Sequence, residues 1–484
     1  MADVPENEQQ DENDGGMDRR SVLKYGGTGA VAAGLAGCQS PENPVPGGQV
    51  RVNNNNGGGG GTGEGDGDGA LAGEIVRIGV LAPMNMPLGQ SIWDGARLAA
   101  KQMNESDGLL GATVEVKLGD TELSPGKAES EHRRLIVQEN CDITCGIFLG
   151  SALLQTFPSI ANQEKLHITT ASAEPRAGEL VSQNQAFTNA EPMEEYERFK
   201  YHFRAGPIHL LDLADAMLEL VEGKKEKFGW ERAALLVENI GELTPYSNRL
   251  QDRLSDVIDV PISERPGGIS DWSPLYNEIE GENCDVAIVG MALSGTTAAN
   301  QWAQQERDFE FGGIHVPSQA YNYWESTDGN VEHIFTMNAM TPQTENTSKT
   351  QKFVNDYMNE FDRVPIYTGP LTYDAITLLE DSVRRTVEEE GMETMPDADT
   401  MIPYMEEMTF TGSTVMDEFQ FTAPDAEYAH EPLWTSIEET GVPVFQQWQL
   451  DPEVREDYGT MHSFFPPQNK TADYAVPEWI KEDS

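Results

Sequence analysis

Short apolar runs alternate with amphipathic segments along the chain from residue 74 onward. The first run, 74–84, is rich in β-branched residues and ends in a loop with proline, which is typical of a strand. Residues 89–106 carry apolar side chains at helical spacing, and residues 112–120 alternate as a second strand. This order predicts an α/β fold in which helices cover both faces of a parallel sheet.

The strand–helix order runs to residue 171 and restarts after residue 205, so the pattern predicts two similar Rossmann-like lobes. Two late helices, 347–361 and 370–391, exceed what the second lobe needs, and we expect them to return to the first lobe. The other expected elements are helices at 126–140, 151–165, 207–223, 245–256, 273–281 and 296–307, and strands at 141–150, 166–171, 232–239, 284–291 and 312–319.

Loops of small and polar residues follow the expected strands in both halves of the chain. Ligands of open α/β sheets bind beyond the carboxyl ends of the strands. Two lobes whose loops face each other would therefore form a cleft that closes around a small molecule by a hinge motion.

Residues 1–38 have the layout of an export signal. Arg19 and Arg20 precede a small apolar run, 25–37, that is too short to span a bilayer. The arginine pair resembles a twin-arginine signal. Leu35–Cys38 resembles a lipobox, in which the chain is cut before the cysteine and the thiol is lipidated. A plain signal peptide with an incidental cysteine and an uncleaved anchor are the alternatives.

Residues 39–73 are rich in Asn and Gly and contain almost no apolar side chains. Such a segment cannot bury enough surface to offset its chain entropy, so we expect a disordered linker. A lipid on Cys38 followed by this linker would hold an exported protein at the outer face of the cytoplasmic membrane. One acyl chain anchors only marginally, and we therefore expect a second.

Acidic residues are spread along the whole chain, with 82 Asp and Glu against 32 Lys and Arg, and the net charge is −50. This charge excludes nucleic acid as a partner, because phosphates would be repelled. Molar salt shortens the Debye length to roughly 3 Å and screens the repulsion within the fold. The composition is typical of a halophilic protein; an acidic mesophilic protein or a specific cationic partner are the alternatives.

No motif for catalysis or for a cofactor occurs in the sequence. The eight histidines are scattered, and nucleophile-elbow, zinc-protease and P-loop patterns are absent. Cys141, Cys145 and Cys284 lie in or beside apolar strand-like runs without histidine partners, so we expect small core residues and no metal. The sequence thus favours a binding protein without enzymatic activity or cofactor.

Several dispersed segments between residues 74 and 450 carry recognisable landmarks. They are "IVRIGVLAPM", "DGARLAAKQMNES", "GIFLGSALLQTFPSIANQEKLHITTASAEP", "FRAGPIHLLDLADAM", "ISDWSPLYNEIEGENCDVAIVGMALSG", "YTGPLTYDAITLLEDSV", "MTFTGSTVMDEFQF" and "VFQQWQLDP". Together and in this order they resemble the type I periplasmic binding proteins of ABC importers, in the branched-chain amino acid and amide-binding group. The resemblance covers roughly residues 74–450.

The resemblance implies two lobes joined by a hinge of about three crossovers. It also implies a monomer that captures a small solute in the cleft and delivers it to the membrane subunits of an ABC permease. A sensor that binds a ligand without transport is the alternative. The implied boundaries are 74–205 plus about 340–408 for the first lobe, 206–339 plus about 409–450 for the second lobe, and 451–484 for a C-terminal tail.

The resemblance also implies ligand-binding residues by position. In the first lobe, Ser151 and Ser172 would supply hydroxyls and Ala171 a backbone contact; a helix cap and a loop hydroxyl are the alternatives for the two serines. Leu88 and Gly89 stand in the first loop, where an aromatic residue is common in the family. In the second lobe, Tyr246 would lie over the ligand or, alternatively, pack at the hinge.

The second lobe departs from the family at one point. Amino-acid binders of this group hold the ligand ammonium with an acidic residue where this chain has Ser318 or Gln319. Burying an ammonium without an anion is costly. Either another acid serves, with Glu174, Glu238 and Glu242 as candidates, or the ligand is an amide, a urea-like compound or an organic acid.

Overall fold

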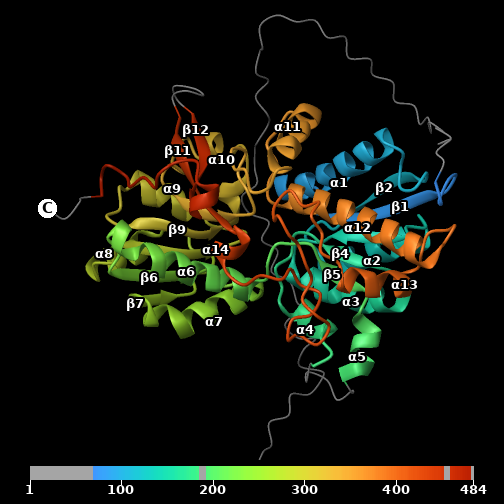
Figure 1. Cartoon of the computed structure of the whole chain (residues 1–484). Coiled ribbons are helices and arrows are strands. Elements are labelled where there is room, and N and C mark those ends of the chain that lie inside the picture. The colour runs from blue at the N-terminus through green and yellow to red at the C-terminus, as the bar shows by residue number, and fades with distance from the viewer. Residues whose placement is uncertain (1–68, 185–191, 452–457, 481–484) are drawn as a thin grey trace, which may run out of the picture. The chain divides into compact units, whose positions relative to one another are not determined.

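The computed structural model describes residues 69–184, 192–451 and 458–480, which belong to one compact unit (Figure 1). The predicted export signal, Cys38 and nearly all of the predicted linker lie outside the described residues. The predicted α/β class is confirmed: two lobes each contain a central sheet dominated by parallel strands.

The sheet of the first lobe has five strands, all of them parallel. Strands β3, β4 and β5 are short and fully buried, as expected for a sheet that is covered on both faces, whereas the edge strand β2 is mostly half-buried. In sheet order they are β2 (Thr113–Asp120), β1 (Ile75–Ala82), β3 (Ile143–Gly146), β4 (His167–Thr169) and β5 (His202–Arg204).

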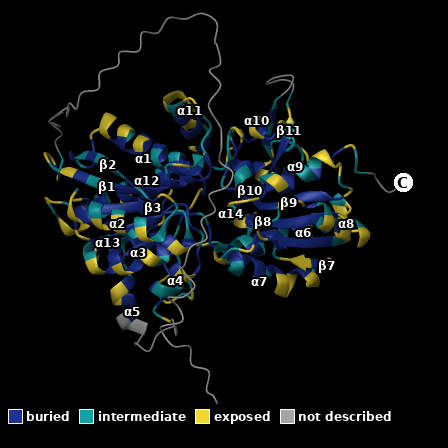
Figure 2. Ribbon diagram, turned by 180° about the vertical axis from the view of Figure 1, so that it is seen from behind, coloured by how far each residue is buried: buried dark blue, intermediate teal, exposed yellow. Residues whose placement is uncertain are grey.

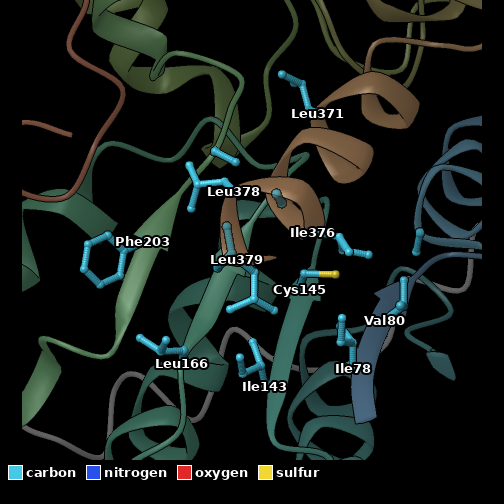
Figure 3. Close-up of a cluster of buried hydrophobic side chains, with 14 of the residues drawn as sticks. Ile78, Val80, Ile143, Cys145, Leu166, Phe203, Leu371, Ile376, Leu378 and Leu379 are labelled. Carbon is cyan, nitrogen blue, oxygen red and sulfur yellow. The ribbon is translucent and has the colours of Figure 1, made fainter. Parts of the chain in front are cut away.

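Helices from two distant parts of the chain cover this sheet. The late helix α12 packs along α1 on one face, and α2 packs along α3 on the other (Figure 1). Figure 3 shows Ile376 and Leu379 of α12 near Ile78 of β1 and Cys145 of β3. The helices are α1 (Pro87–Glu105), α2 (Pro125–Val137), α3 (Gly150–Gln163), α4 (Arg176–Val181), α5 (Pro192–Phe199), α11 (Thr350–Phe361), α12 (Thr368–Glu390) and α13 (Ala398–Glu406).

The sheet of the second lobe has seven strands, and its strands pair in parallel except for β11, which is antiparallel to both of its neighbours, β10 and β12. In sheet order the strands are β12 (Gly459–Phe465), β11 (Val444–Leu450), β10 (Phe335–Asn338), β9 (Glu310–His315), β8 (Val286–Met291), β6 (Arg232–Val237) and β7 (Asp259–Glu264). The helices of this lobe are α6 (Leu210–Phe228), α7 (Thr244–Arg253), α8 (Ser273–Gly281), α9 (Thr296–Gln304), α10 (Tyr323–Ser326) and α14 (Ile437–Thr440).

Alternation along the central strands sends side chains to two separate cores. Leu235 of β6 packs with α6 and α7, whereas its neighbours Ala234 and Leu236 pack with α8 and α9. Figure 2 shows the central strands buried and the exposed residues gathered on the outer helices. The two-sided burial explains why these strands appear in the sequence as continuous apolar runs.

Two boundaries differ from the expected ones. Residues 409–431, expected in the second lobe, place Phe410, Phe419 and Phe421 in the core of the first lobe. The expected tail, 451–484, contains β12, which pairs with β11 and closes the second sheet. In both cases buried aromatic side chains decide the placement, because their apolar surface is large. The late helices do return to the first lobe, as expected.

Candidate functional site

A cavity of about 140 Å³ lies where the carboxyl ends of strands from both lobes meet. First-lobe loops after β3, β4 and β5 supply one wall, and second-lobe loops after β6, β8 and β9 supply the other. A dry cavity of roughly this size accommodates a benzene-sized molecule. The site therefore suits a small ligand that both lobes can contact at once.

The lining is dominated by apolar side chains from both lobes and from the three connections in which the chain passes between them, at residues 205–209, 339–349 and 432–443. The described lining residues include two acids, Glu174 and Glu242, and none of them is Lys, Arg or His. The apolar members include Leu149, Leu210, Leu213, Ile240, Leu243, Leu293, Ile314, Val316, Met337, Leu371, Val415 and Met416.

The loop Ala171–Glu174, which follows β4, forms the polar part of the first-lobe wall. The Tyr367 hydroxyl donates to the Ala171 carbonyl at 3.0 Å, and the Ser172 hydroxyl accepts the Glu174 N–H at 3.4 Å. Glu174 is 8% exposed, and its side chain lies against Gly150 at the start of α3. Burial raises the pKa of the Glu174 carboxyl, and the Arg176 N–H opposes that shift.

Helix α3 begins beside Glu174 without a side-chain cap. Its N-cap residue is Leu149, which cannot accept a hydrogen bond from the first turn, and Leu149 and Gly150 both line the cavity. The first N–H groups of a helix lack partners within the helix and favour a negative group. A ligand carboxylate at this wall would meet donors, while an ammonium next to it would meet Glu174.

The second-lobe wall carries its acid after β6. Glu242 lies in the short 3₁₀ turn Gly241–Leu243 and accepts the Ser151 hydroxyl of the first lobe at 2.7 Å. Glu238, the other acid of this loop, accepts the N–H groups of residues 292–294 at 3.0–3.1 Å. Glu238 therefore holds the loop after β8, whereas Glu242 faces the cavity.

Gln319 also lines the cavity and is 5% exposed. Its amide nitrogen donates to the Met337 carbonyl, and its side-chain oxygen has no partner. An unpaired buried acceptor is costly unless a ligand donor or a water fills it. Gln319 thus adds a third acceptor to the two carboxylates.

Of the eight residues expected at the site, Ala171, Ser172 and Gln319 line the cavity. Ser151 is exposed beside it and reaches Glu242. The other four lie in supporting positions. The Leu88 carbonyl accepts the Thr368 hydroxyl at 2.8 Å, and the Ser318 hydroxyl donates to the His315 carbonyl at 2.8 Å.

Gly89 and Tyr246 are placed by packing. A Cβ at Gly89 would come within 2.0 Å of the Pro83 carbonyl oxygen, so the close backbone approach requires glycine. Tyr246 is fully buried against Gly290 in the core under α6 and α7, and its hydroxyl has no partner. Burial raises the pKa of Tyr246 above its ordinary value. Among the described residues, neither side chain lines the cavity.

Sequence reasoning missed the residues that support the loop 171–174. Arg204, Glu431 and Tyr367 hold this loop but lie far apart in the chain. The only signal is an arginine at the end of the buried strand β5, because a charge is rarely buried without a partner. Nothing in the sequence indicates that this partner is Glu431.

Metal-binding clusters, membrane-spanning helices and the cysteines also bear on function. The described residues contain no group of three or more His, Cys, Asp or Glu side chains placed to hold a metal ion. Within the same residues, no helix has the length and apolar character needed to cross a bilayer. Cys141, Cys145 and Cys284 are buried, as the sequence predicts, and are free thiols.

Comparison with known proteins gives a family and a set of similar folds. The family model described as periplasmic binding protein matches residues 75–441. A leucine binding protein from Thermotoga maritima superposes with a TM-score of 0.61 at 17% identity, covering 80% of this chain and 97% of that one. A search of curated proteins by sequence found no match.

Two other solved structures carry different ligands. A branched-chain amino acid transporter substrate binding protein from Streptococcus pneumoniae, in complex with isoleucine, has a TM-score of 0.60 at 14% identity, covering 81% of this chain and 100% of that one. A solute binding protein from R. palustris, in complex with benzoate, has a TM-score of 0.60 at 15% identity and covers 85% and 100%. At these identities the likeness shows the fold.

Proposed function

This chain belongs to the type I periplasmic binding proteins of ABC transporters, and we propose that it captures an apolar amino acid for delivery to a membrane permease. The observation that carries the proposal is the pair Glu174 and Glu242 in an otherwise apolar cavity, with no basic side chain among the described lining residues. The buried Glu174 carboxylate and the half-buried Glu242 carboxylate are stabilised by a ligand that brings a positive charge.

The remaining lining supports the rest of an amino acid. The start of α3 offers N–H donors for a carboxylate, and Glu174 lies beside it for the ammonium on the same carbon. The leucines, isoleucines and methionines of both lobes suit a branched aliphatic side chain. Glu174 and Glu242 thus replace the acid that the family places where this chain has Ser318 and Gln319.

An aromatic carboxylate is the second candidate, because the cavity is apolar and a similar fold in R. palustris binds benzoate. Such a ligand would use the start of α3 but would leave both acids without a counter-charge. An amide or urea-like compound would satisfy Gln319 but would leave most of the apolar lining without contact.

Calorimetry on the purified chain in molar KCl tests the proposal. We expect leucine, isoleucine or valine to bind in the micromolar range or tighter, and benzoate, acetamide and urea to bind far more weakly. Benzoate binding in the absence of amino-acid binding would replace the proposal by the second candidate. Preferential binding of acetamide or urea would identify Gln319 as the main polar contact.

The N-terminal and surface features complete the proposal. We expect Arg19 and Arg20 to direct export and Cys38 to carry the lipid, so Cys38→Ser should release the protein into the medium. Retention of that variant on the membrane would contradict the lipid anchor.

We also expect the net charge of −50 to make the fold depend on molar salt, so the thermal unfolding temperature should rise with KCl.

A further inference from the structure

A fully buried arginine lies behind the loop Ala171–Glu174. Arg204, at the end of β5, has no exposed side-chain surface and does not line the cavity. Its guanidinium donates to the carbonyl of Ser172 and, at 2.7 Å, to the carbonyl of Glu174. It also donates to the Glu431 carboxylate. One side chain thus connects two points of the ligand loop with a residue far along the chain.

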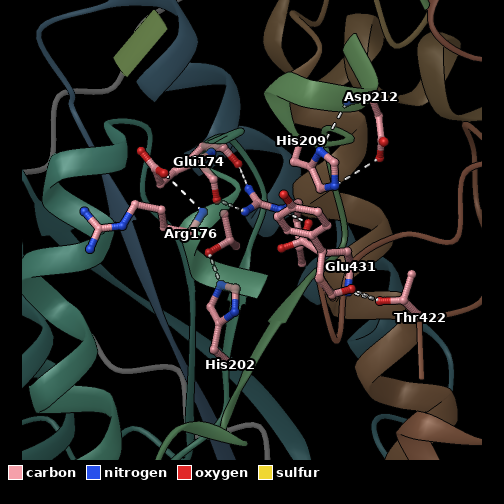
Figure 4. Close-up of polar contacts among 11 residues, drawn as sticks. Glu174, Arg176, His202, His209, Asp212, Thr422 and Glu431 are labelled. Carbon is pink, nitrogen blue, oxygen red and sulfur yellow. Dashed lines mark hydrogen bonds and ion pairs between the residues drawn. The ribbon is translucent and has the colours of Figure 1, made fainter. Parts of the chain in front are cut away.

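Glu431 brings a second segment to the same point. Its side chain is buried against Gly178 of α4, and its N–H donates to the Thr422 hydroxyl at 3.0 Å (Figure 4). The next residue, Pro432, lines the cavity. Arg204 and Glu431 therefore connect the loop 171–174 with the segment that leads into the last connection between the lobes.

Stability alone does not account for this pair. Replacing a buried ion pair by apolar residues of similar volume is often neutral or stabilising. What an apolar pair cannot do is donate hydrogen bonds to two carbonyls in a fixed planar geometry, which is the particular property of a guanidinium. The two loop carbonyls turn away from the cavity toward Arg204, and the Glu174 side chain is left on the cavity wall.

We infer that Arg204 and Glu431 are positioning residues that fix the loop Ala171–Glu174 so that the Glu174 carboxylate meets the ligand. This inference rests on the proposed function for the ligand contact itself. It goes beyond that function because neither residue touches the cavity, and because it assigns the shape of the polar wall to a pair 227 positions apart.

Two variants and one control test the inference on the full chain. Arg204→Met with Glu431→Leu removes both charges together, so no unpaired charge stays buried. Arg204→Lys keeps the charge beside Glu431 but cannot reach both carbonyls at once. The matched control is Arg307→Met with Glu280→Leu, a half-buried pair of the second lobe with a 2.8 Å contact away from the cavity.

Two readouts are taken on each variant: the leucine dissociation constant, and hydrogen–deuterium exchange of the peptide that covers residues 170–177. We expect both Arg204 variants to weaken leucine binding at least tenfold and to speed exchange in this peptide. The control should leave both readouts at the wild-type value. Exchange in peptides outside residues 170–177 reports any loss of global stability, so faster exchange confined to this peptide in the Arg204 variants indicates positioning.

The outcomes separate this inference from the proposed function. Wild-type exchange of residues 170–177 in both Arg204 variants would overturn the inference, whatever their affinity for leucine. Failure of the wild-type protein to bind leucine would overturn the proposed function, and exchange without ligand would then decide the inference. If the double variant does not fold, Arg204→Lys alone gives both readouts.

Discussion

The two walls of the cavity are held in place by opposite charges. In the first lobe, the Arg204 guanidinium donates to two carbonyls of the loop 171–174. In the second lobe, the Glu238 carboxylate accepts three N–H groups of residues 292–294. A carboxylate with three backbone donors is satisfied by a single loop, whereas the guanidinium needs a carboxylate as well, and Glu431 supplies it.

We call the Arg204–Glu431 pair the long-range anchor of the first wall and Glu238 with residues 292–294 the local anchor of the second wall. The first-lobe wall depends on a contact between residues that are distant in the chain, and the second-lobe wall depends on two neighbouring strand ends. Disruption of the first wall should therefore cost more stability and more affinity than disruption of the second. The lobes also differ in how their buried histidines are arranged. This difference gives the largest expected effect on stability, which appears on acidification.

Acidification should distinguish the lobes most strongly. His132, His167 and His202 lie in a row in the first lobe, with successive ring centroids 6.2 Å apart, and burial lowers their pKa, for His132 to about 4. Between pH 6.5 and 4 the unfolded chain binds protons at these histidines and the folded chain does not. The free energy of unfolding therefore falls as the pH falls from about 6.5 toward 4. For His132 alone, this shift corresponds to a loss of about 3 kcal/mol in the free energy of unfolding by pH 4.

The measurement is hydrogen exchange from pH 7 to pH 4. We expect the first lobe to lose protection at a higher pH than the second, because the second-lobe histidines with lowered pKa values, His209, His315 and His333, each pack against an aromatic ring and not against another histidine. His132→Asn keeps a partner for Ser159 and removes one titrating group, so it should reduce the acid loss. Simultaneous loss of protection in both lobes would contradict the account.

Breaking the long-range anchor should have the next largest effect. Arg204→Met leaves the Glu431 carboxylate buried without its cation, which costs about 3–5 kcal/mol. Urea unfolding measures the loss, with Arg307→Met as the control at a pair in which Glu280 is about one-third exposed. An equal loss of unfolding free energy in the two variants would show that burial of the Arg204–Glu431 pair adds nothing to the cost of breaking it.

The local anchor should be easier to replace. Glu238→Gln keeps one acceptor oxygen for residues 292–294 but turns an amide nitrogen toward at least one N–H. We expect a loss of about 1–3 kcal/mol in unfolding free energy and a smaller loss of leucine affinity than for Arg204→Lys. A larger effect than that of Arg204→Met would reverse the comparison of the two walls.

The smallest stability change should come from Gly150→Ala. The new Cβ would lie 2.9 Å from the Cβ and Oε2 atoms of Glu174, so the Glu174 side chain must shift. The free energy of unfolding should fall by about 1 kcal/mol, because the carboxylate end of Glu174 can move away but its Cβ is fixed to the backbone of the loop 171–174, which must shift slightly. Calorimetry should still detect weaker leucine binding. Unchanged affinity would argue against a ligand contact by Glu174.

Much of the fold was accessible from periodicity. Helix α8 matches its predicted range, 273–281, and most other elements lie within a few residues of theirs. Strand β3 is shorter than predicted because Gly146 and Ile147 adopt positive φ values and end the ladder. Strands β5, β7, β10 and β12 are short or lie at sheet edges, where the pattern carries little signal.

The site was less accessible than the fold. Three of the eight expected residues line the cavity, because strand ends can be located from the sequence but loop shapes cannot. Glu174 and Glu242 were candidates only because Ser318 and Gln319 lack a charge. Contacts such as Arg204 with Glu431 depend on how residues 409–431 return to the first lobe, and no local pattern specifies that path.

The central claim is that Glu174 and Glu242 bind the ammonium of an amino acid. Calorimetry of the wild-type chain and of Glu174→Gln with Glu242→Gln, each titrated with leucine and with 4-methylpentanoate, tests it most directly. The two compounds differ only in the ammonium group. The account predicts that wild type strongly prefers leucine and that the double variant loses most of this preference. Equal binding of both compounds to wild type, or an unchanged preference in the variant, would contradict it.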